Sequence, residues 1–328
     1  MRLVLGFLAV ALLGAQEVHP DRTVTFRLKA PKAGEVRLWG DWILRANATE
    51  ALTKDAQGQW SFTTAPLEPG LYTYVLLVDG AEVPGKLVEV PGASPLVTDF
   101  RPVPHGVVHT HSYNSPAGLG VRQVLVYTPP DYAEGKSYPT LYLLHGSGDT
   151  ETSWMETGRV HWMADNLIAA GKAKPMVIVM ANGRGPAPKE SEADLLEGVV
   201  PLVETNYRVI RSARSRAIAG QSLGGFQALW LGLDHPEVFG SIGTFAGGIW
   251  DDEGKQQVAR YAARPEHQMR LFYIAAGDRD MNLTLARRLD ETLAEHGIRH
   301  VMRVGKGQGH AWPYWRSCLA DFLEMVFQ

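Results

Sequence analysis

Residues 217–225 read Ala217-Ile218-Ala219-Gly220-Gln221-Ser222-Leu223-Gly224-Gly225. The first three residues are apolar and predict a buried strand, and the apolar run through residue 231 predicts a helix that opens at Gly225. Between them lies a Gly-X-Ser-X-Gly turn that leads directly from strand to helix. Its glycines let the backbone come close to neighbouring elements where a Cβ atom would clash. The turn therefore predicts a Ser222 hydroxyl at a helix N-terminus, where backbone N–H groups face developing negative charge.

The segments around this turn alternate between apolar strands and helix-period runs. Strands are predicted at residues 121–127, 140–144, 176–180, 217–219, 271–276 and 300–304, and helices at 160–170, 194–207, 283–296 and 311–327. Continuous apolar strands that alternate with helices are typical of a mostly parallel sheet covered on both faces. The sequence after residue 106 thus predicts a doubly wound α/β domain.

The segment before residue 90 has a different rhythm. From about Thr23 to Val90, short alternating stretches are separated by turn residues, with no helix-period run. This pattern predicts a small all-β sandwich, and the Pro- and Gly-rich residues 91–106 predict a linker. The predicted boundaries are a leader at 1–15, a sandwich at 16–90, the linker, and the α/β domain at 107–328.

The N-terminus has the features of a secretory signal peptide. A basic start is followed by an apolar run of 11 residues from Leu3 to Leu13, and then by small residues ending at Ala15. The run is shorter than the roughly 20 residues that span a bilayer. We therefore expect a secreted or periplasmic protein with no membrane association after the leader is removed.

Composition excludes several classes of function. Lys and Arg number 32 against 35 Asp and Glu, a net charge of -3, which gives no electrostatic footprint for nucleic acid or an anionic membrane. The single cysteine, Cys318, forms no internal disulfide and cannot build a cysteine-based zinc site. No metal or cofactor is expected.

A serine hydroxyl is a weak nucleophile and needs a histidine base oriented by a carboxylate. Of the 11 histidines, His310 ends a glycine loop between the last predicted strand and the last helix, where a doubly wound sheet presents residues at its carboxyl edge. The acid is expected between Ser222 and His310 in the chain. Asp278 and Asp280 both follow the strand at 271–276, and their position alone leaves both open.

An oxyanion hole needs a second backbone N–H besides that of the residue after the nucleophile. The strand at 140–144 ends in the glycine-rich turn His145-Gly146-Ser147-Gly148. We expect the N–H groups of Ser147 and Leu223 to form the hole, and His145 to hold the turn.

These motifs resemble carbohydrate esterase family one, the esterase D and feruloyl esterase group, which is itself similar to enterochelin esterases and the mycolyltransferase fold. The likeness runs from about Val107 to the C-terminus. It rests on residues 126–130 (VYTPP), 143–146 (LLHG), 165–169 (DNLIA), 172–176 (KAKPM), 217–225 and 309–316 (GHAWPYWR). The resemblance implies an α/β-hydrolase fold, and it implies Asp280, not Asp278, as the acid.

The N-terminal segment resembles the early-set immunoglobulin-like module that precedes some of these esterases. Residues 39–42 (WGDW), 58–60 (GQW) and 72–80 carry this likeness. Some relatives of this module bind glycans through exposed tryptophans, but we expect Trp39 and Trp60 to lie in the core.

Together these observations predict an exported serine esterase that acts on feruloyl or acetyl esters of plant polysaccharides. Ser222, His310 and Asp280 form the expected triad, and Trp154 and Trp312 are candidate walls of the substrate pocket. The alternatives are an acyltransferase, a siderophore esterase of the enterochelin type, and a carbohydrate-binding protein with an inert hydrolase fold.

Overall fold

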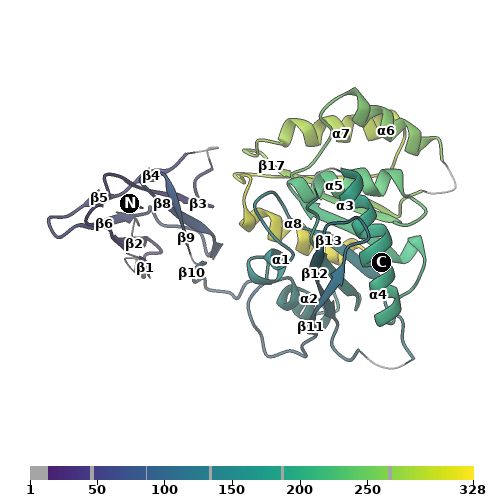
Figure 1. Ribbon diagram of the computed structural model, residues 1–328, viewed down its shortest axis with the longest axis horizontal. Coiled ribbons are helices and arrows are strands. Elements are labelled where there is room, and N and C mark those ends of the chain that lie inside the picture. The colour runs from purple at the N-terminus through teal and green to yellow at the C-terminus, as the bar shows by residue number, and fades with distance from the viewer. Residues whose placement is uncertain (1–13, 45–47, 86, 133–134, 186–187, 265–267) are drawn as a thin grey trace, which may run out of the picture. The chain divides into compact units, whose positions relative to one another are not determined.

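The computed structural model describes residues 14–328 except 45–47, 86, 133–134, 186–187 and 265–267 (Figure 1). The chain forms two compact units, Met1–Ser94 and Pro95–Gln328. Residues 1–13 of the predicted signal peptide lie outside the described residues, and Gly14 and Ala15 begin the first strand of the first unit. Among the described residues, no helix combines the length and the apolar character needed to cross a membrane.

The first unit is all-β, as the sequence predicted. Its strands are β1 (Gly14–Val18), β2 (Val24–Lys29), β3 (Val36–Gly40), β4 (Glu50–Ala51), β5 (Thr53–Lys54), β6 (Gln59–Thr63), β7 (Gly70–Tyr72), β8 (Tyr74–Val78), β9 (Ala81–Pro84) and β10 (Val88–Val90). They form two four-stranded sheets, in the orders β1-β2-β6-β5 and β4-β3-β8-β9, and the pair β10-β7. The inward residues of these strands share one apolar core.

The stretch at 71–78, which reads as one strand, is divided at Thr73. The Thr73 N–H donates to Asp41 Oδ2 at 2.6 Å, so β7 pairs with β10 while β8 pairs with β3. Trp60 is buried and donates its indole N–H to the Ala30 carbonyl at 2.9 Å, whereas Trp39 is only half-buried. Trp60 therefore lies in the core, as expected, whereas the same expectation for Trp39 is wrong, because its side chain keeps part of its surface exposed.

The second unit is built on an eight-stranded sheet. Its strands are β11 (Val107–Asn114), β12 (Val121–Thr128), β13 (Thr140–Leu144), β14 (Val177–Ala181), β15 (Arg216–Gln221), β16 (Ser241–Phe245), β17 (Leu271–Gly277) and β18 (Val301–Gly305). Their order is β11-β12-β14-β13-β15-β16-β17-β18. β12 pairs antiparallel with both of its neighbours, β11 and β14, and all the other neighbouring strands pair parallel. The predicted doubly wound sheet is confirmed.

Helices cover both faces of this sheet (Figure 1). They are α1 (Ser153–Glu156), α2 (Val160–Ala169), α3 (Pro188–Ala193), a π-helix (Asp194–Val199), α4 (Val200–Asn206), a 3₁₀ turn (Ala213–Ser215), α5 (Leu223–Asp234), α6 (Asp252–Ala262), α7 (Leu283–Glu295) and α8 (Trp312–Met325). In one core cluster, the helices α4, α5, α6 and α7 pack against one face of the sheet. The other joins α1, α2 and α8 to the opposite face, and it includes the fully buried Cys318.

Two central elements, β16 and α6, carry little signal in the sequence. β16 reads Ser-Ile-Gly-Thr-Phe and is fully buried, and a Cβ on Gly243 would lie 2.9 Å from Phe322 and 3.0 Å from Ala219. A small residue is therefore required where a central strand ordinarily shows a branched apolar one. In α6 only Gln257, Val258 and Tyr261 are buried, so its apolar stripe is too narrow to recognise.

Most of the predicted linker, residues 95–106, is fastened to the second unit. Asn166 Nδ2 donates to the carbonyls of Val97 and Asp99, each at 2.8 Å. The Asp165 carboxylate is 1% exposed; it accepts the Gly106 N–H at 2.9 Å and lies 2.8 Å from His105 Nδ1. Residues 95–106 therefore belong to the second unit, and the boundary between units falls after Ser94.

This anchoring predicts different stabilities for two truncations. A chain that begins at Pro95 retains the partners of Asp165, whereas a chain that begins at Val107 leaves a buried carboxylate short of two of them. We expect the Val107 truncation to melt about 3 °C or more below the Pro95 truncation, because an orphaned buried acceptor is destabilising. Differential scanning calorimetry measures the difference, and equal melting temperatures would contradict a stabilising role for residues 95–106.

Candidate active site

Ser222 stands at the junction of β15 and α5 in a strained backbone conformation. It is the N-cap residue of α5 with φ 51° and ψ -120°, an uncommon combination for a residue with a side chain. Its N–H donates to the Phe245 carbonyl at 2.8 Å, and its own carbonyl accepts from Phe226 N at 3.1 Å. These bonds hold the Ser222 hydroxyl at the carboxyl edge of the parallel strands.

The two glycines of the turn have a steric reason. A Cβ on Gly224 would lie 2.6 Å from the carbonyl oxygens of both Leu144 and His145, and a Cβ on Gly220 would lie 2.5 Å from Gly224 backbone atoms. All these obstacles are backbone atoms that cannot rotate away. The Gly-X-Ser-X-Gly pattern is therefore the only one that lets β15, α5 and the end of β13 approach this closely.

His310 reaches the serine from the loop between β18 and α8. Its Nε2 atom lies 2.9 Å from Ser222 Oγ, and its Nδ1 atom lies 2.9 Å from Asp280 Oδ1. The imidazole is 22% exposed, whereas the Asp280 side chain is fully buried. The Trp315 ring stands perpendicular to the imidazole at 5.0 Å between centroids, which fixes the plane of the ring. Serine, histidine and aspartate thus form one chain of hydrogen bonds.

The two neighbouring aspartates have different surroundings. Asp280 Oδ1 also accepts the Asn282 N–H at 2.8 Å, and Asn282 Nδ2 in turn donates to the Ala246 carbonyl. Asp278 is exposed, and its carboxylate accepts the Gly307 N–H at 2.8 Å. Asp280 therefore faces the imidazole, while Asp278 ties the glycine loop that carries it.

The turn after β13 lies beside the serine. His145 is buried, with its Nδ1 atom 2.9 Å from the Gly146 carbonyl, as expected of a residue that holds the turn. Gln221 Nε2 donates to Asp149 Oδ2 at 2.8 Å. Burial raises the pKa of the Asp149 carboxyl, partly opposed by this hydrogen bond.

The two N–H groups expected to form the oxyanion hole lie on this turn and on the serine turn. Ser147 and Leu223 are both exposed, and no acceptor within the described residues takes up the N–H of either. Both donors are thus available to a bound oxyanion.

The two tryptophans expected to wall the pocket are packed in the core instead. Trp154 is 1% exposed and donates its indole N–H to the Leu144 carbonyl, and Trp312, 5% exposed, packs edge-on against it at 5.0 Å. Both belong to the core cluster shared with α2 and α8. They present almost no surface to a substrate, because large apolar rings at these positions fill the space beneath the His310 loop.

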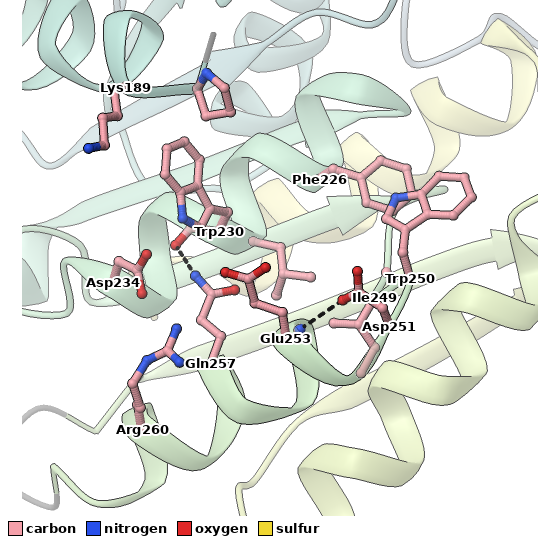
Figure 2. Close-up of a pocket in the computed structure, with 14 residues that line it drawn as sticks. Lys189, Phe226, Trp230, Asp234, Ile249, Trp250, Asp251, Glu253, Gln257 and Arg260 are labelled. Atoms are coloured by element: carbon pink, nitrogen blue, oxygen red, sulfur yellow. Dashed lines mark hydrogen bonds between the residues drawn. The ribbon is translucent and has the colours of Figure 1, made fainter.

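A hollow that sequence reasoning missed begins beside the serine turn. Its first part, about 390 Å³, is lined by Leu223, Phe226, Trp230 and the residues around Arg184. Phe226 and Trp230 also line a second part of about 720 Å³, which continues to Trp250 and α6 (Figure 2). Leu223, Phe226 and Trp230 are three and four residues apart, a spacing that places them on one face of a helix. This spacing is visible in the sequence and could have indicated the hollow.

An eight-stranded sheet of this order, with a nucleophile turn after its fifth strand, defines the α/β-hydrolase class. Residues 119–325 match the model of the Esterase family, described as "Putative esterase". The chain belongs to this family.

Several proteins are similar to the chain. An endo-1,4-beta-xylanase/feruloyl esterase from Xylanibacter ruminicola is 29% identical over 95% of this chain. The chain covers 46% of that enzyme and 58% of a second relative from Corynebacterium glutamicum, so it spans about half of their length. An S-formylglutathione hydrolase from Paracoccus denitrificans is 26% identical, with 66% of this chain and 92% of that enzyme covered.

Solved structures share the fold. A ferulic acid esterase from Anaeromyces mucronatus superposes with a TM-score of 0.63 at 24% identity, over 70% of this chain and 93% of that one. The enterobactin esterase from Shigella flexneri superposes with a TM-score of 0.72 at 17% identity, over 96% of both chains. The second match includes the all-β unit as well as the hydrolase unit.

The crowding at Gly224 predicts the effect of a single methyl group. Gly224→Ala forces the serine turn away from β13, and displacement of a reacting group by about 1 Å lowers turnover about 100-fold. We expect at least that loss in kcat on nitrophenyl acetate, together with a lower melting temperature. Gly34→Ala is the control, because its Cβ would meet only a side-chain oxygen, Asp79 Oδ1, at 3.3 Å. Normal turnover by Gly224→Ala would contradict the steric argument.

Proposed function

We propose that the protein is an exported serine esterase that hydrolyses feruloyl or acetyl esters of plant polysaccharides. The observation that carries the proposal is the continuous hydrogen bonding from Ser222 Oγ through His310 to the buried Asp280 carboxylate. This arrangement activates a serine toward an acyl carbon. Export rests on the signal-peptide pattern of residues 1–15.

In the first half of the reaction, Ser222 Oγ attacks the ester carbonyl carbon while His310 Nε2 removes its proton. The negative charge that develops on the carbonyl oxygen is held by the N–H groups of Ser147 and Leu223. Asp280 keeps the Nδ1 proton of the imidazole in place and stabilises the imidazolium. The C–O bond to the alcohol then breaks, and His310 gives its proton to the departing alcohol.

In the second half, a water molecule takes the place of the alcohol. His310 removes a proton from this water as its oxygen attacks the acyl-enzyme carbon, and the same two N–H groups hold the oxyanion again. The bond to Ser222 Oγ breaks, the carboxylic acid leaves, and the proton on His310 returns to the serine. No step needs a metal or a cofactor.

The choice of substrate class is supported by the relatives. The Xylanibacter ruminicola protein, which aligns with 95% of this chain, joins xylanase and feruloyl esterase activities by name. A ferulic acid esterase structure at 27% identity covers 68% of this chain and 97% of its own. Both names point to esters of ferulic acid, and the first also points to xylan as the polysaccharide.

A panel of esters tests the proposal directly. The panel contains nitrophenyl acetate, a feruloylated arabinoxylo-oligosaccharide, acetylated xylan and a cyclic catecholate siderophore ester. We expect hydrolysis of nitrophenyl acetate and of at least one of the xylan esters, and none by Ser222→Ala. Exclusive cleavage of the siderophore ester would replace the substrate class, and transfer to an added sugar in place of hydrolysis would mark an acyltransferase. Complete inactivity on the panel would leave a carbohydrate-binding protein.

The two aspartates provide the sharpest test of the catalytic residues. Asp280→Asn should lower kcat by a factor on the order of 10⁴, because an amide favours the wrong imidazole tautomer. Asp278→Asn, the matched control two residues away, should lower kcat less than about tenfold, because its carboxylate only ties the His310 loop. Steady-state kinetics on nitrophenyl acetate measures both, and the reverse ranking would reassign the acid to Asp278.

A further inference from the structure

The hollow beside α5 has the features of a binding site for a polysaccharide chain. Leu223, Phe226, Trp230 and Asp234 succeed one another at helical spacing and line it from end to end. The helix rises about 1.5 Å per residue, so these four side chains cover roughly 16 Å from the residue beside Ser222. The hollow is therefore a groove that starts at Leu223, the residue after the nucleophile, and we refer to it as the α5 groove.

One end of the α5 groove is an aromatic platform. The Trp250 side chain is 63% exposed and stacks on Phe226 with ring centroids 5.2 Å apart and planes inclined by 27°. Figure 2 shows the two rings lying against one another at one end of the pocket. The backbone beside them is fixed, because the Trp250 carbonyl accepts from the Arg288 guanidinium and Ile249 N donates to the Leu285 carbonyl. The exposed indole therefore offers a fixed aromatic face on which a ligand can stack.

The other end of the groove is polar. Figure 2 shows Asp234, Gln257 and Arg260 gathered there, beside Trp230 and on the opposite side of the pocket from the aromatic platform. Gln257 Nε2 donates to the Trp230 carbonyl at 3.0 Å, which joins α6 to α5 beneath the groove. Within the described residues, neither the Asp234 carboxylate nor the Arg260 guanidinium has a side-chain partner. Both remain available to the hydroxyl groups of a ligand.

The lining selects the chemistry of the ligand. Its charged residues balance, three positive against three negative: Arg184, Lys189 and Arg260, and Asp234, Asp251 and Glu253. This balance disfavours phosphates and other anions, and so many charges disfavour an acyl chain. Aromatic faces together with carboxylate, amide and guanidinium groups suit a neutral polyol, whose C–H faces stack on rings and whose hydroxyls both donate and accept.

We infer that the α5 groove binds the polysaccharide backbone of the ester, on the alcohol side of the scissile bond. The inference rests on the proposed function for the position of the ester at Ser222, and it adds a subsite that recognises the glycan itself. A chain bound along α5 from Leu223 to Asp234 presents its acylated sugar to the serine. The groove thereby favours esters on an oligosaccharide over esters of small alcohols.

Binding of an ester-free xylo-oligosaccharide to the full-length protein tests the inference independently of hydrolysis. We expect Trp250→Ala to weaken the affinity in isothermal titration calorimetry by about tenfold, the effect of losing an aromatic anchor. Asp234→Asn, which changes the polar end with little steric change, should weaken it about threefold. Phe100→Ala is the matched control, because Phe100 is 65% exposed and stacks on His105, away from the groove lining. It should bind like the wild type.

Kinetics provides the second readout. For Trp250→Ala, the ratio of kcat/KM on a feruloylated arabinoxylo-oligosaccharide to kcat/KM on nitrophenyl acetate should fall about tenfold, and Phe100→Ala should keep the wild-type ratio. Circular dichroism checks that each variant is folded. If Trp250→Ala does not fold, the test is made with Asp234→Asn.

Failure of the groove inference and failure of the proposed function give different results. An active esterase whose binding and selectivity ratio are unchanged in both groove variants would overturn the inference and leave the proposed function standing. If the groove variants bound the sugar normally but lost activity on nitrophenyl decanoate and not on nitrophenyl acetate, the groove would be a site for the acyl chain and the inference would be overturned. Sugar binding that depends on Trp250 in a protein inactive on every ester would instead refute the proposed function.

Discussion

The close approach of three backbone segments at Ser222 is the constraint on which the second unit depends. The carbonyls of Leu144 and His145, at the end of β13, lie where a Cβ of Gly224 would stand. Because the contact is so tight, β13 lies against the start of α5, and the turn that follows β13 begins beside Gly224. The positive φ of Ser222 costs free energy, and the packing of the surrounding sheet offsets this cost.

The loops at the carboxyl edge then divide their tasks. Asp278 ties the glycine loop through Gly307, Asp280 faces the imidazole, and Asn282 fixes Asp280 while reaching back to the end of β16. These three residues thus fasten the His310 loop and the end of β16 to the segment that follows β17. Such preorganisation leaves the His310 ring little freedom to rotate, which favours an environment ready for charge to develop.

The sequence predicted those parts of the structure whose signals are local. Continuous apolar strands such as 140–144, and the glycine pattern around Ser222, predict their conformation from neighbouring residues alone. The α/β class and the position of the serine could therefore be predicted from the sequence. β16 was not, because Gly243 is small for reasons of packing against Phe322, a residue 79 positions away in the chain. The choice between Asp278 and Asp280 also depends on which carboxylate points inward, and spacing alone carries no such information. Trp154 illustrates the opposite error, since an aromatic residue near the site was taken for a pocket wall and belongs to the core.

The two faces of the central sheet support different halves of the chemistry. The imidazole rests on Trp315 and the α8 face, whereas the α5 groove lies on the face covered by α5, α6 and α7. Residues in separate clusters with no shared partners make nearly additive contributions to free energy. Natural drift or laboratory selection can therefore alter which alcohols are accepted, through positions such as Trp230 and Trp250, without compensating changes around the base. The sheet acts as a partition between two independently evolvable surfaces.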